Sequence, residues 1–202
     1  MPQIQIIVNI ELVINKMSNI YITSDLHLFH NKDFVYNPRG FDSVEVMIAT
    51  IVKNWNEIIN NEDVVYILGD CVLGDTEKGV NILKQLKGHK HLIIGNHDTD
   101  KRLERYKEEN IFESIQYATL LKYNKYHFYL SHYPTLCDNY DMGQSLKTRV
   151  INLCGHTHTT NKFIDMKLGL IYHCELDAHN CKPVLIDDII TDIRLYLKEN
   201  II

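Results

Sequence analysis

The stretch Val64-Val-Tyr-Ile-Leu68-Gly69-Asp70 is a short apolar run that ends at a glycine and a carboxylate. Such a run predicts a buried strand, and glycine lets the chain turn tightly at the strand's end. The same arrangement recurs at Ile20 to Thr23, just before Asp25, and at His91 to Ile94, just before Gly95-Asn96-His97-Asp98. Polar residues therefore follow the carboxyl ends of several predicted strands, where open α/β sheets place their ligands.

Helical patterns separate these strands. Ser43 can cap a helix whose apolar residues recur three and four positions apart from Val44 to Ile58, and a second amphipathic pattern runs from Thr76 to Leu86. This alternation of strands and helices indicates an α/β protein. Further on, the sequence predicts a hairpin of Tyr117 to Leu121 with His127 to Leu130, strands at Val150 to Cys154, Leu170 to Cys174 and Pro183 to Ile186, and a closing helix from Asp188 to Asn200.

The length and composition favour a single globular domain. The chain has 202 residues, of which 45% are hydrophobic and 23% charged, and this balance is ordinary for one folded domain. We expect residues 1–16 to be an N-terminal extension and residues 17–202 to be the domain, with Met17 as an alternative start of translation. The apolar opening is interrupted by Gln5, Asn9 and Glu11, so it predicts neither a membrane-spanning helix nor a signal peptide.

Charge and cysteine content exclude two further classes of protein. A formal net charge of −5 gives no broad basic surface of the kind that nonspecific binding to duplex nucleic acid requires. The five cysteines include no C-x-x-C pair, which argues against a disulfide framework and a thiolate zinc site. A reducing, cytoplasmic location fits best.

Five polar motifs follow the predicted strands, and each has a structural alternative when taken alone. Asp25-Leu-His27 could be a surface loop, Asp70 a turn residue, and Asp98 a helix cap. Ser131-His132-Tyr133-Pro134 and Gly155-His156-Thr157-His158 could carry satisfied structural histidines. However, five of the eleven histidines fall in these loops beside Asp and Asn, and packing does not account for that coincidence. Nitrogen and oxygen donors without thiolate favour manganese, iron, zinc, nickel or cobalt, and we place manganese first.

In this order, the motifs D-x-H, G-D, G-N-H-D, S-H-Y-P and G-H-T-H resemble the calcineurin-like metallophosphoesterase family from Ile20 to about Val184. The resemblance implies two mixed β-sheets packed as a sandwich and flanked by helices, in four layers (αββα). It also implies a phosphoester hydrolase in which two divalent transition-metal ions, about 3.5–4 Å apart, activate a hydroxide. Two such ions outweigh the charges of Asp25 and Asp70 and leave an electropositive pocket for phosphate.

The resemblance further implies a role for each motif residue. Asp70 would bridge the two metals, and His97 would be the general acid, oriented by Asp98. No motif position is substituted, which favours an active enzyme over a noncatalytic member of the family. The implied ligands of one metal are Asp25, His27 and His158, and those of the other are Asn96, His132 and His156.

Three residues are candidates for contact with the substrate. Asn96 is one, and Arg39 and His30 lie in an early loop that should border the metals, where Arg could bind a phosphate group through two hydrogen bonds. The alternative for Arg39 and His30 is a solvated loop. Asp177-Ala-His-Asn180 resembles a polar turn of the family, and we expect a structural role or support of a ligand.

The expected substrate is a small phosphate ester, with a free nucleotide favoured over duplex DNA. A diester is slightly preferred to a monoester, because no cluster of Arg or Lys lies near the motifs to neutralise a dianion. Two alternatives stay open at this point: a phosphomonoesterase or protein phosphatase, and a binding module that has the fold without the activity.

Overall fold

The computed structural model describes residues 18–137, 145–163 and 170–200, and its strands form two sheets. In both sheets most neighbours are parallel, but β9 runs antiparallel to β1 and β5 antiparallel to β6. The five-stranded sheet has the order β4 (Ser114–Gln116), β3 (His89–Ile93), β2 (Val64–Ile67), β1 (Ile20–Thr23), β9 (Val184–Leu185), and the four-stranded sheet the order β5 (Ala118–Tyr123), β6 (Tyr126–Ser131), β7 (Val150–Cys154), β8 (Ile171–His173).

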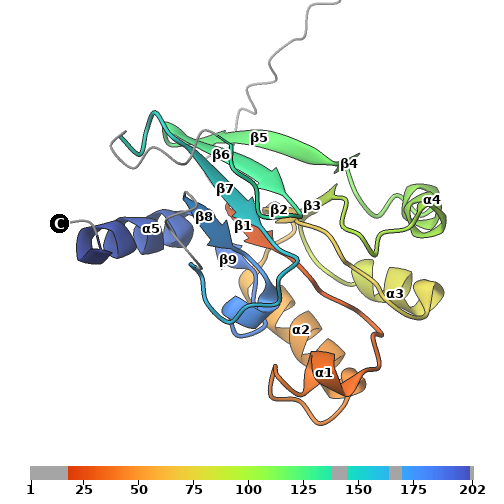
Figure 1. Cartoon of the computed structure of the whole chain (residues 1–202). Helices are drawn as coiled ribbons and strands as arrows, with labels where there is room; N and C mark the ends of the chain where they lie inside the picture. The colour runs from red at the N-terminus through yellow and green to blue at the C-terminus, as the bar shows by residue number, and fades with distance from the viewer. Residues whose placement is uncertain (1–17, 138–144, 164–169, 201–202) are drawn as a thin grey trace, which may run out of the picture.

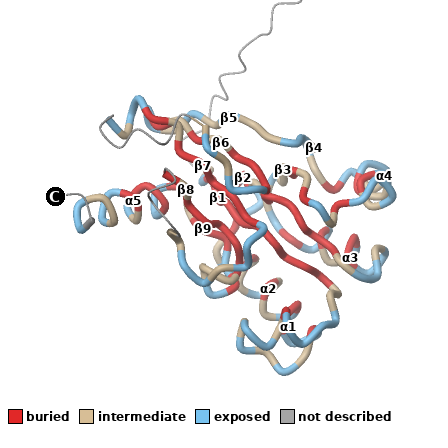
Figure 2. Tube along the Cα trace, viewed as in Figure 1, coloured by how far each residue is buried: buried red, intermediate tan, exposed pale blue. Residues whose placement is uncertain are grey.

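The two sheets pack against each other, and helices cover the free face of the five-stranded sheet (Figure 1). Successive side chains of β2 point to opposite faces of the sheet, so one set packs between the two sheets and the other packs under the helices. Val64 and Leu68 pack with Phe128 and Leu153 between the sheets, whereas Val65 packs against the helices. Buried residues run along the inner strands of both sheets, whereas β4 and β5 are half-buried or exposed (Figure 2). The predicted sandwich of two mixed sheets with flanking helices is confirmed.

The helix α2 (Val44–Ile58) supplies most of the helical layer. The Ser43 side chain accepts a hydrogen bond from the Val46 amide at the predicted cap, and the apolar stripe of the helix is buried. Trp55 is fully buried and donates its indole N–H to the Lys87 carbonyl at 2.9 Å. Burying one large apolar side chain contributes roughly 1.5–3 kcal/mol, so this stripe fixes the helix on the sheet.

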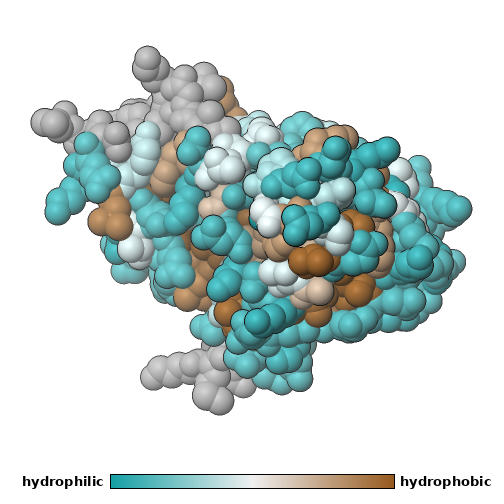
Figure 3. Space-filling model, turned by 90° about the horizontal axis from the view of Figure 1, so that it is seen from below, coloured by the Kyte–Doolittle hydropathy of each residue, from teal (hydrophilic) through white to brown (hydrophobic). Residues whose placement is uncertain are grey.

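The remaining helices differ from the predicted ones mainly at their ends. α3 (Thr76–Leu83) ends before Leu86, and α5 (Ile186–Asn200) begins two residues before the predicted Asp188. Four short or polar elements among the described residues were not predicted, because they bury few residues: α1 (Asp33–Tyr36), α4 (Asp100–Glu108), β4 and the 3-10 helix η2 (Leu176–Ala178). A groove lined by apolar and charged side chains lies between α2 and α3. The face of the molecule seen from below is mainly hydrophilic, with some apolar patches (Figure 3).

The hairpin of β5 and β6 is also longer than predicted. Asn124 and Lys125 both have positive φ, at 47° and 69°, as in the two-residue turns that match the twist of a hairpin. The strands therefore pair up to Tyr123 and Tyr126. Tyr117, predicted at the start of β5, lies just before it and is 80% exposed.

Two predictions concern the whole chain. The predicted extension, residues 1–16, lies outside the described residues. In the described part of the chain, no helix has both the length and the apolar character needed to cross a membrane.

Candidate metal centre

The polar motifs meet at one edge of the sandwich, where strands of both sheets end. Asp25 follows β1, Asp70 follows β2, His132 follows β6 and His156 follows β7. Backbone hydrogen bonds join these strand ends within each sheet, from the Asp25 amide to the Gly69 carbonyl at 3.1 Å and from the Gly155 amide to the His132 carbonyl at 3.0 Å. The sheets therefore bring motifs that are more than a hundred residues apart into one place.

The ligand-bearing loops are tightly coiled rather than extended. Five predicted ligands have positive φ values between 48° and 78°: Asp25, His27, Asp70, His156 and His158. For a residue with a side chain this conformation costs roughly 1–2 kcal/mol, and such strain gathers at functional sites. Asp25 and His27 do point to one site, as predicted, but they do so from this left-handed backbone.

Glycine is required beside two of the ligands because the backbone approaches them closely. A Cβ on Gly95 would lie 2.2 Å from Asp70 Oδ1, and one on Gly155 would lie 1.9 Å from Ser24 Oγ and 2.4 Å from Asp25 Oδ2. Real Cβ atoms do not approach other atoms so closely. The two motif glycines thus make room for the carboxylates.

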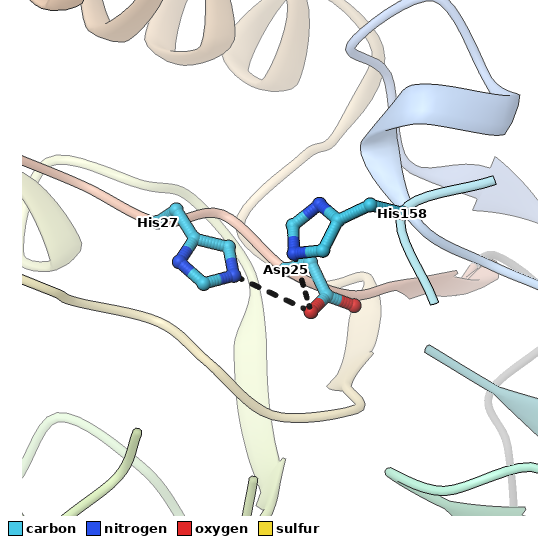
Figure 4. Close-up of side chains that lie close together, drawn as sticks. All are labelled: Asp25, His27 and His158. Carbon is cyan, nitrogen blue, oxygen red and sulfur yellow. Dashed lines mark ion pairs between the residues drawn. The ribbon is translucent and has the colours of Figure 1, made fainter. Parts of the chain in front are cut away.

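Asp25, His27 and His158 form what we name the first cluster (Figure 4). Asp25 Oδ1 lies 3.5 Å from His27 Nε2 and 3.7 Å from His158 Nε2. The other oxygen, Oδ2, accepts hydrogen bonds from the Ser24 hydroxyl and from the His156 amide. One carboxylate oxygen is thus held by the protein, while the other faces the two imidazoles.

His132, Asn96 and His156 form the second cluster. Asn96 Oδ1 lies 2.8 Å from His132 Nε2, and the His156 ring lies 5.0 Å from the His132 ring, centroid to centroid. Asp70 lies between the clusters, since its Oδ2 is 3.6 Å from both His27 Nε2 and His132 Nε2. Asp25, Asp70 and His132 could also hold one ion in common, so the carboxylate of Asp70 lies beside histidines of both clusters.

Unsatisfied buried atoms indicate that cations belong in this arrangement. Asp25 Oδ1 and both ring nitrogens of His27 are buried without a hydrogen-bond partner among the described residues. Leaving a buried polar group unpaired costs about 1–3 kcal/mol. In the second cluster His132 Nδ1 lies 2.8 Å from the Leu68 carbonyl, so Nδ1 carries the proton and the lone pair of Nε2 faces the Asn96 oxygen. Two acceptors aimed at each other suit a metal ion.

The outer nitrogen of His158 has a charged partner. His158 Nδ1 lies 3.2 Å from Asp177 Oδ2, and the same carboxylate binds the Arg39 guanidinium through Nε at 3.0 Å and Nη2 at 2.7 Å. Arg39 Nη2 also donates to the Asp25 carbonyl at 2.8 Å. Carboxylates in this position orient metal-binding imidazoles. Asp177 therefore contacts a predicted ligand, His158, which agrees with the supporting role expected for this polar turn.

Arg39 does not have the predicted place in the site. Its side chain is only 1% exposed, and its nitrogens are engaged by Asp177 and by backbone carbonyls of Asp25 and Leu26. Contact with a substrate phosphate would require breaking the paired hydrogen bonds to Asp177. Arg39 instead ties its loop to Asp177 and to the backbone of Asp25.

Burial and neighbouring charges shift the pKa values of the residues in the first cluster. Burial acts to raise the pKa of Asp25, but the nearby imidazoles of His27 and His158 lower it below the ordinary value. Burial lowers the pKa of His27. For His158 burial also opposes protonation, but the Asp177 hydrogen bond and the Asp25 charge outweigh it and raise the pKa. His27 is thus held as a neutral ligand, and His158 as a more basic one.

Asp98 also differs from its predicted role. Its Oδ2 accepts from the amides of Asp70 and Gly95, both at 2.9 Å, and its Oδ1 accepts from the Cys71 amide at 3.2 Å. Burial raises the pKa of Asp98 to about 6 in spite of these bonds. The carboxylate therefore fastens the loops after β2 and β3 to each other, and it does not orient the His97 ring.

His97 and His30 border the first cluster. The His97 ring lies 5.5 Å from the His27 ring, and its Nε2 is 3.9 Å from Asp70 Oδ2. The His30 ring lies 5.4 Å from the His27 ring on another side, and burial beside the other histidines lowers the pKa of His30 to about 4. Both predicted residues therefore lie beside the first cluster.

A buried carboxylate that the sequence did not predict supports the G-H-T-H turn. Glu175 is fully buried, and its Oε1 accepts from the Thr157 hydroxyl at 2.7 Å and from the Thr157 amide at 3.2 Å. His173 Nδ1 lies 3.1 Å from the same oxygen. Glu175 thus fixes the residue between the two histidines of the turn, and a charged residue directly after a buried apolar strand was the available signal.

Comparison with known proteins identifies the family. The family model of the calcineurin-like phosphoesterase superfamily domain matches residues 18–173. The chain belongs to this superfamily. It is a family of metal-dependent phosphoesterases, which are hydrolases. The side chains that lie close enough together to hold a metal ion in this chain are Asp25, His27 and His158, and Asp25, Asp70 and His132.

Small proteins of archaea and phages are similar to this superfamily member. An uncharacterized protein of Methanocaldococcus jannaschii is 32% identical over 86% of this chain and 90% of its own length. The gene 66 protein of Mycobacterium phage L5 is 30% identical over 71% of this chain and 79% of its own length. A solved structure of a protein of unknown function from Aquifex aeolicus shares the fold, with a TM-score of 0.67 and 23% identity over 86% of this chain and 98% of that one.

Proposed function

We propose that this protein hydrolyses a phosphate ester, a diester in preference to a monoester, with one divalent cation in each cluster. The observation that carries the proposal is the position of Asp70, whose Oδ2 lies 3.6 Å from a histidine of each cluster. One carboxylate can serve two ions only if their other ligands approach it from two sides, as His27 and His132 do. A single structural ion would not need this arrangement.

Each cluster is proposed to bind one metal ion. Asp25, His27 and His158 hold one ion, Asn96, His132 and His156 hold the other, and Asp70 joins them. When bound, the ions lower the pKa of a water molecule and offset the charge of the phosphate oxygens. Manganese is the first choice, because imidazole and oxygen donors suit it; iron, zinc, nickel and cobalt fit the same donors.

His97 is the proposed general acid. Its side chain is 39% exposed and lies at the edge of the ligand set. Its backbone is held on both sides, with the amide donating to Asp70 Oδ1 at 2.8 Å and the carbonyl accepting from Arg102 at 2.6 Å. An imidazole so placed can reach a substrate oxygen and give it a proton as the ester bond breaks.

The preference for a diester is supported by the charges around the centre. Arg39 is engaged by Asp177, and Arg102 donates to the His97 carbonyl. A monoester dianion is best bound by free guanidinium or ammonium groups in addition to the metals, and the Arg39 guanidinium, paired with Asp177, does not offer one. A singly charged ester of small size, such as a nucleotide ester, is the proposed substrate, and a phosphomonoester is the alternative.

The test combines metal content with turnover. We expect the purified protein to contain up to two transition-metal ions per chain and to hydrolyse bis(p-nitrophenyl) phosphate faster than p-nitrophenyl phosphate when supplied with manganese. The reverse order of rates would make the protein a phosphomonoesterase. A protein that binds no metal and is inert towards both esters with every divalent cation would instead be a noncatalytic binding module.

A further inference from the structure

Tyr133 is a large aromatic side chain at the metal centre that the proposed function does not use. It directly follows His132, and its ring makes edge contacts with two histidines of the second cluster, at 5.0 Å from His132 and 4.7 Å from His156, centroid to centroid. Half of the residue, 50%, nevertheless stays exposed. An apolar ring that packs on metal ligands with one side and faces water with the other is available to a substrate.

The backbone of Tyr133 is held firmly in place. Its carbonyl accepts hydrogen bonds from the hydroxyls of Ser131 at 2.7 Å and Thr135 at 2.9 Å. The Thr135 amide in turn donates to the side chain of Asn152 at 2.8 Å. Asn152 is fully buried in β7 and also donates to the Ser131 hydroxyl at 2.9 Å. These bonds fix the turn that presents the ring, and binding to a fixed aromatic side chain loses little conformational entropy.

We propose that Tyr133 determines substrate specificity by stacking on a planar group, such as a nucleobase, in the part of the ester that is not the leaving group. This inference rests on the proposed phosphoesterase function and names the substrate class for it. His97 lies beside the first cluster, so the leaving group departs on that side. The remaining substituent of a phosphodiester is then directed to the second cluster, where Tyr133 lies.

The chemistry of the surroundings favours a neutral planar group over a charged one. Every base has an apolar face, and stacking on an aromatic side chain tolerates differences in sequence or base type. Tyr133 contacts two imidazoles that are assigned as metal ligands, so a cationic substituent would be repelled by the ions. An aliphatic substituent would gain less, because it lacks the flat face that matches the ring.

The experiment compares two diesters that share a leaving group and a single negative charge. Thymidine 5′-(p-nitrophenyl phosphate) carries a nucleoside, whereas methyl p-nitrophenyl phosphate carries a methyl group. For Tyr133→Ala we expect kcat/KM to fall about ten-fold or more on the nucleoside ester, through KM, and by less than about two-fold on the methyl ester. Tyr133→Phe should behave like the wild type. Tyr133→Leu, which keeps apolar contact with the two histidines, should share the loss seen with Ala.

Two controls separate stacking from other effects. Metal content per chain should be unchanged in all three variants; loss of metal would mean that Tyr133 supports His132 and His156, and would overturn the inference. Phe34, 68% exposed with its ring 5.5 Å from that of His30, is the competing platform at the other end of the centre. A selective loss in Phe34→Ala with none in Tyr133→Ala would also overturn it, as would equal losses on both esters.

A binding measurement distinguishes failure of this inference from failure of the proposed function. Calorimetry with thymidine 5′-phosphate and methyl phosphate needs no turnover. If neither ester is hydrolysed but Tyr133→Ala binds thymidine 5′-phosphate about ten-fold more weakly than wild type, Tyr133 stacks on the base of a bound nucleotide and the hydrolase proposal fails. If both esters are hydrolysed and Tyr133→Ala discriminates between them as wild type does, the hydrolase proposal stands and the inference fails.

Discussion

One histidine of each cluster, His158 in the first and His132 in the second, is oriented by a different kind of partner. In the first cluster a carboxylate holds the outer nitrogen, with Asp177 Oδ2 at 3.2 Å from His158 Nδ1. In the second cluster a backbone carbonyl does so, with Leu68 O at 2.8 Å from His132 Nδ1. A carboxylate adds negative charge behind the ring and makes the imidazole more basic, whereas a carbonyl fixes the tautomer without charge.

This difference shows what each cluster depends on. The second cluster takes its geometry from the end of β2, where the Leu68 carbonyl is part of the fold's own backbone. The first depends on a side-chain network, because Asp177 is itself held by Arg39, 138 residues away in the sequence. The first cluster should therefore be the more sensitive to single substitutions and to pH.

The largest effect is expected for Asp70, which lies between the two clusters. Asp70→Ala should lower the metal content at both positions and reduce turnover by at least about 10³-fold, because it removes the carboxylate that we propose as the bridge between the ions. Elemental analysis of the purified variant measures this. His27→Ala is the matched control, and it should lose only the metal of the first cluster. Wild-type occupancy of both positions in Asp70→Ala would refute the bridging role.

The next effect concerns chemistry at the border of the first cluster. His97→Ala should retain both metals but lose about 10²–10⁴-fold in kcat/KM on an alkyl diester, the usual contribution of general acid catalysis. On an aryl diester the loss should be much smaller, because nitrophenolate departs without a proton. His89→Ala, a surface histidine at the start of β3 that pairs with Glu113, is the control. Equal losses on the two esters would remove the general-acid role.

The sequence predicted the strands that carry the ligands because they are buried apolar runs ending at polar residues. β1, β2, β3 and β7 all follow this pattern, and their carboxyl ends converge at the edge of the sandwich. α4 escaped prediction because only Leu103 and Tyr106 of its residues are buried. Its polar composition hides the helical period.

Long-range side-chain contacts set the limit of prediction within the site. Motif order predicts the seven proposed ligands, but nothing in the sequence pairs Arg39 with Asp177. In the sequence, an arginine that is held by a distant carboxylate looks the same as one that is free to bind phosphate. Asp98 is similar, since its partners are the backbone amides of Asp70, Cys71 and Gly95. Backbone amides carry no sequence signal, so only the folded arrangement of the loops reveals the role of this carboxylate.

A smaller effect should separate the two clusters directly. Asp177→Asn removes the charge behind His158 and should weaken the metal of the first cluster about 10–100-fold, the usual cost of losing such a partner. The metal of the second cluster should keep its affinity, because the Leu68 carbonyl is untouched. Metal titration against a competing chelator measures both affinities. The control is Asp187→Asn, because the Asp187 carboxylate binds the Tyr123 hydroxyl. If Asp177→Asn weakened the binding of both metals equally, the proposed difference between the two clusters would be wrong.

The smallest effect is a pH dependence confined to the first cluster of metal-free protein. The raised pKa of His158 means that its protonated form stabilises the fold below its ordinary value of about 6.5, and this stability is lost as the pH rises through the raised pKa. Burial acts to raise the pKa of Asp177, but His158 and Arg39 lower it below the ordinary value. The ionised Asp177 carboxylate therefore contributes stability above about pH 3.9, the ordinary pKa of Asp, and this stability is lost as the pH falls through the lowered pKa. The pair therefore stabilises the protein between about pH 4 and 6.5.

His158→Ala in protein stripped of metal should consequently lower the free energy of unfolding more at pH 5.5 than at pH 8.5. The difference should be no more than about 1 kcal/mol, because the His158 side chain is 37% exposed and water screens the pair. Urea unfolding at the two pH values measures it. In an Asp177→Asn background the pH-dependent part should shrink, since the charge of Asp177 is gone and the Asp25 charge alone still raises the pKa of His158. A cost of His158→Ala that is the same at both pH values would show that the carboxylate orients the ring without making it more basic, and the two clusters would then differ in geometry alone.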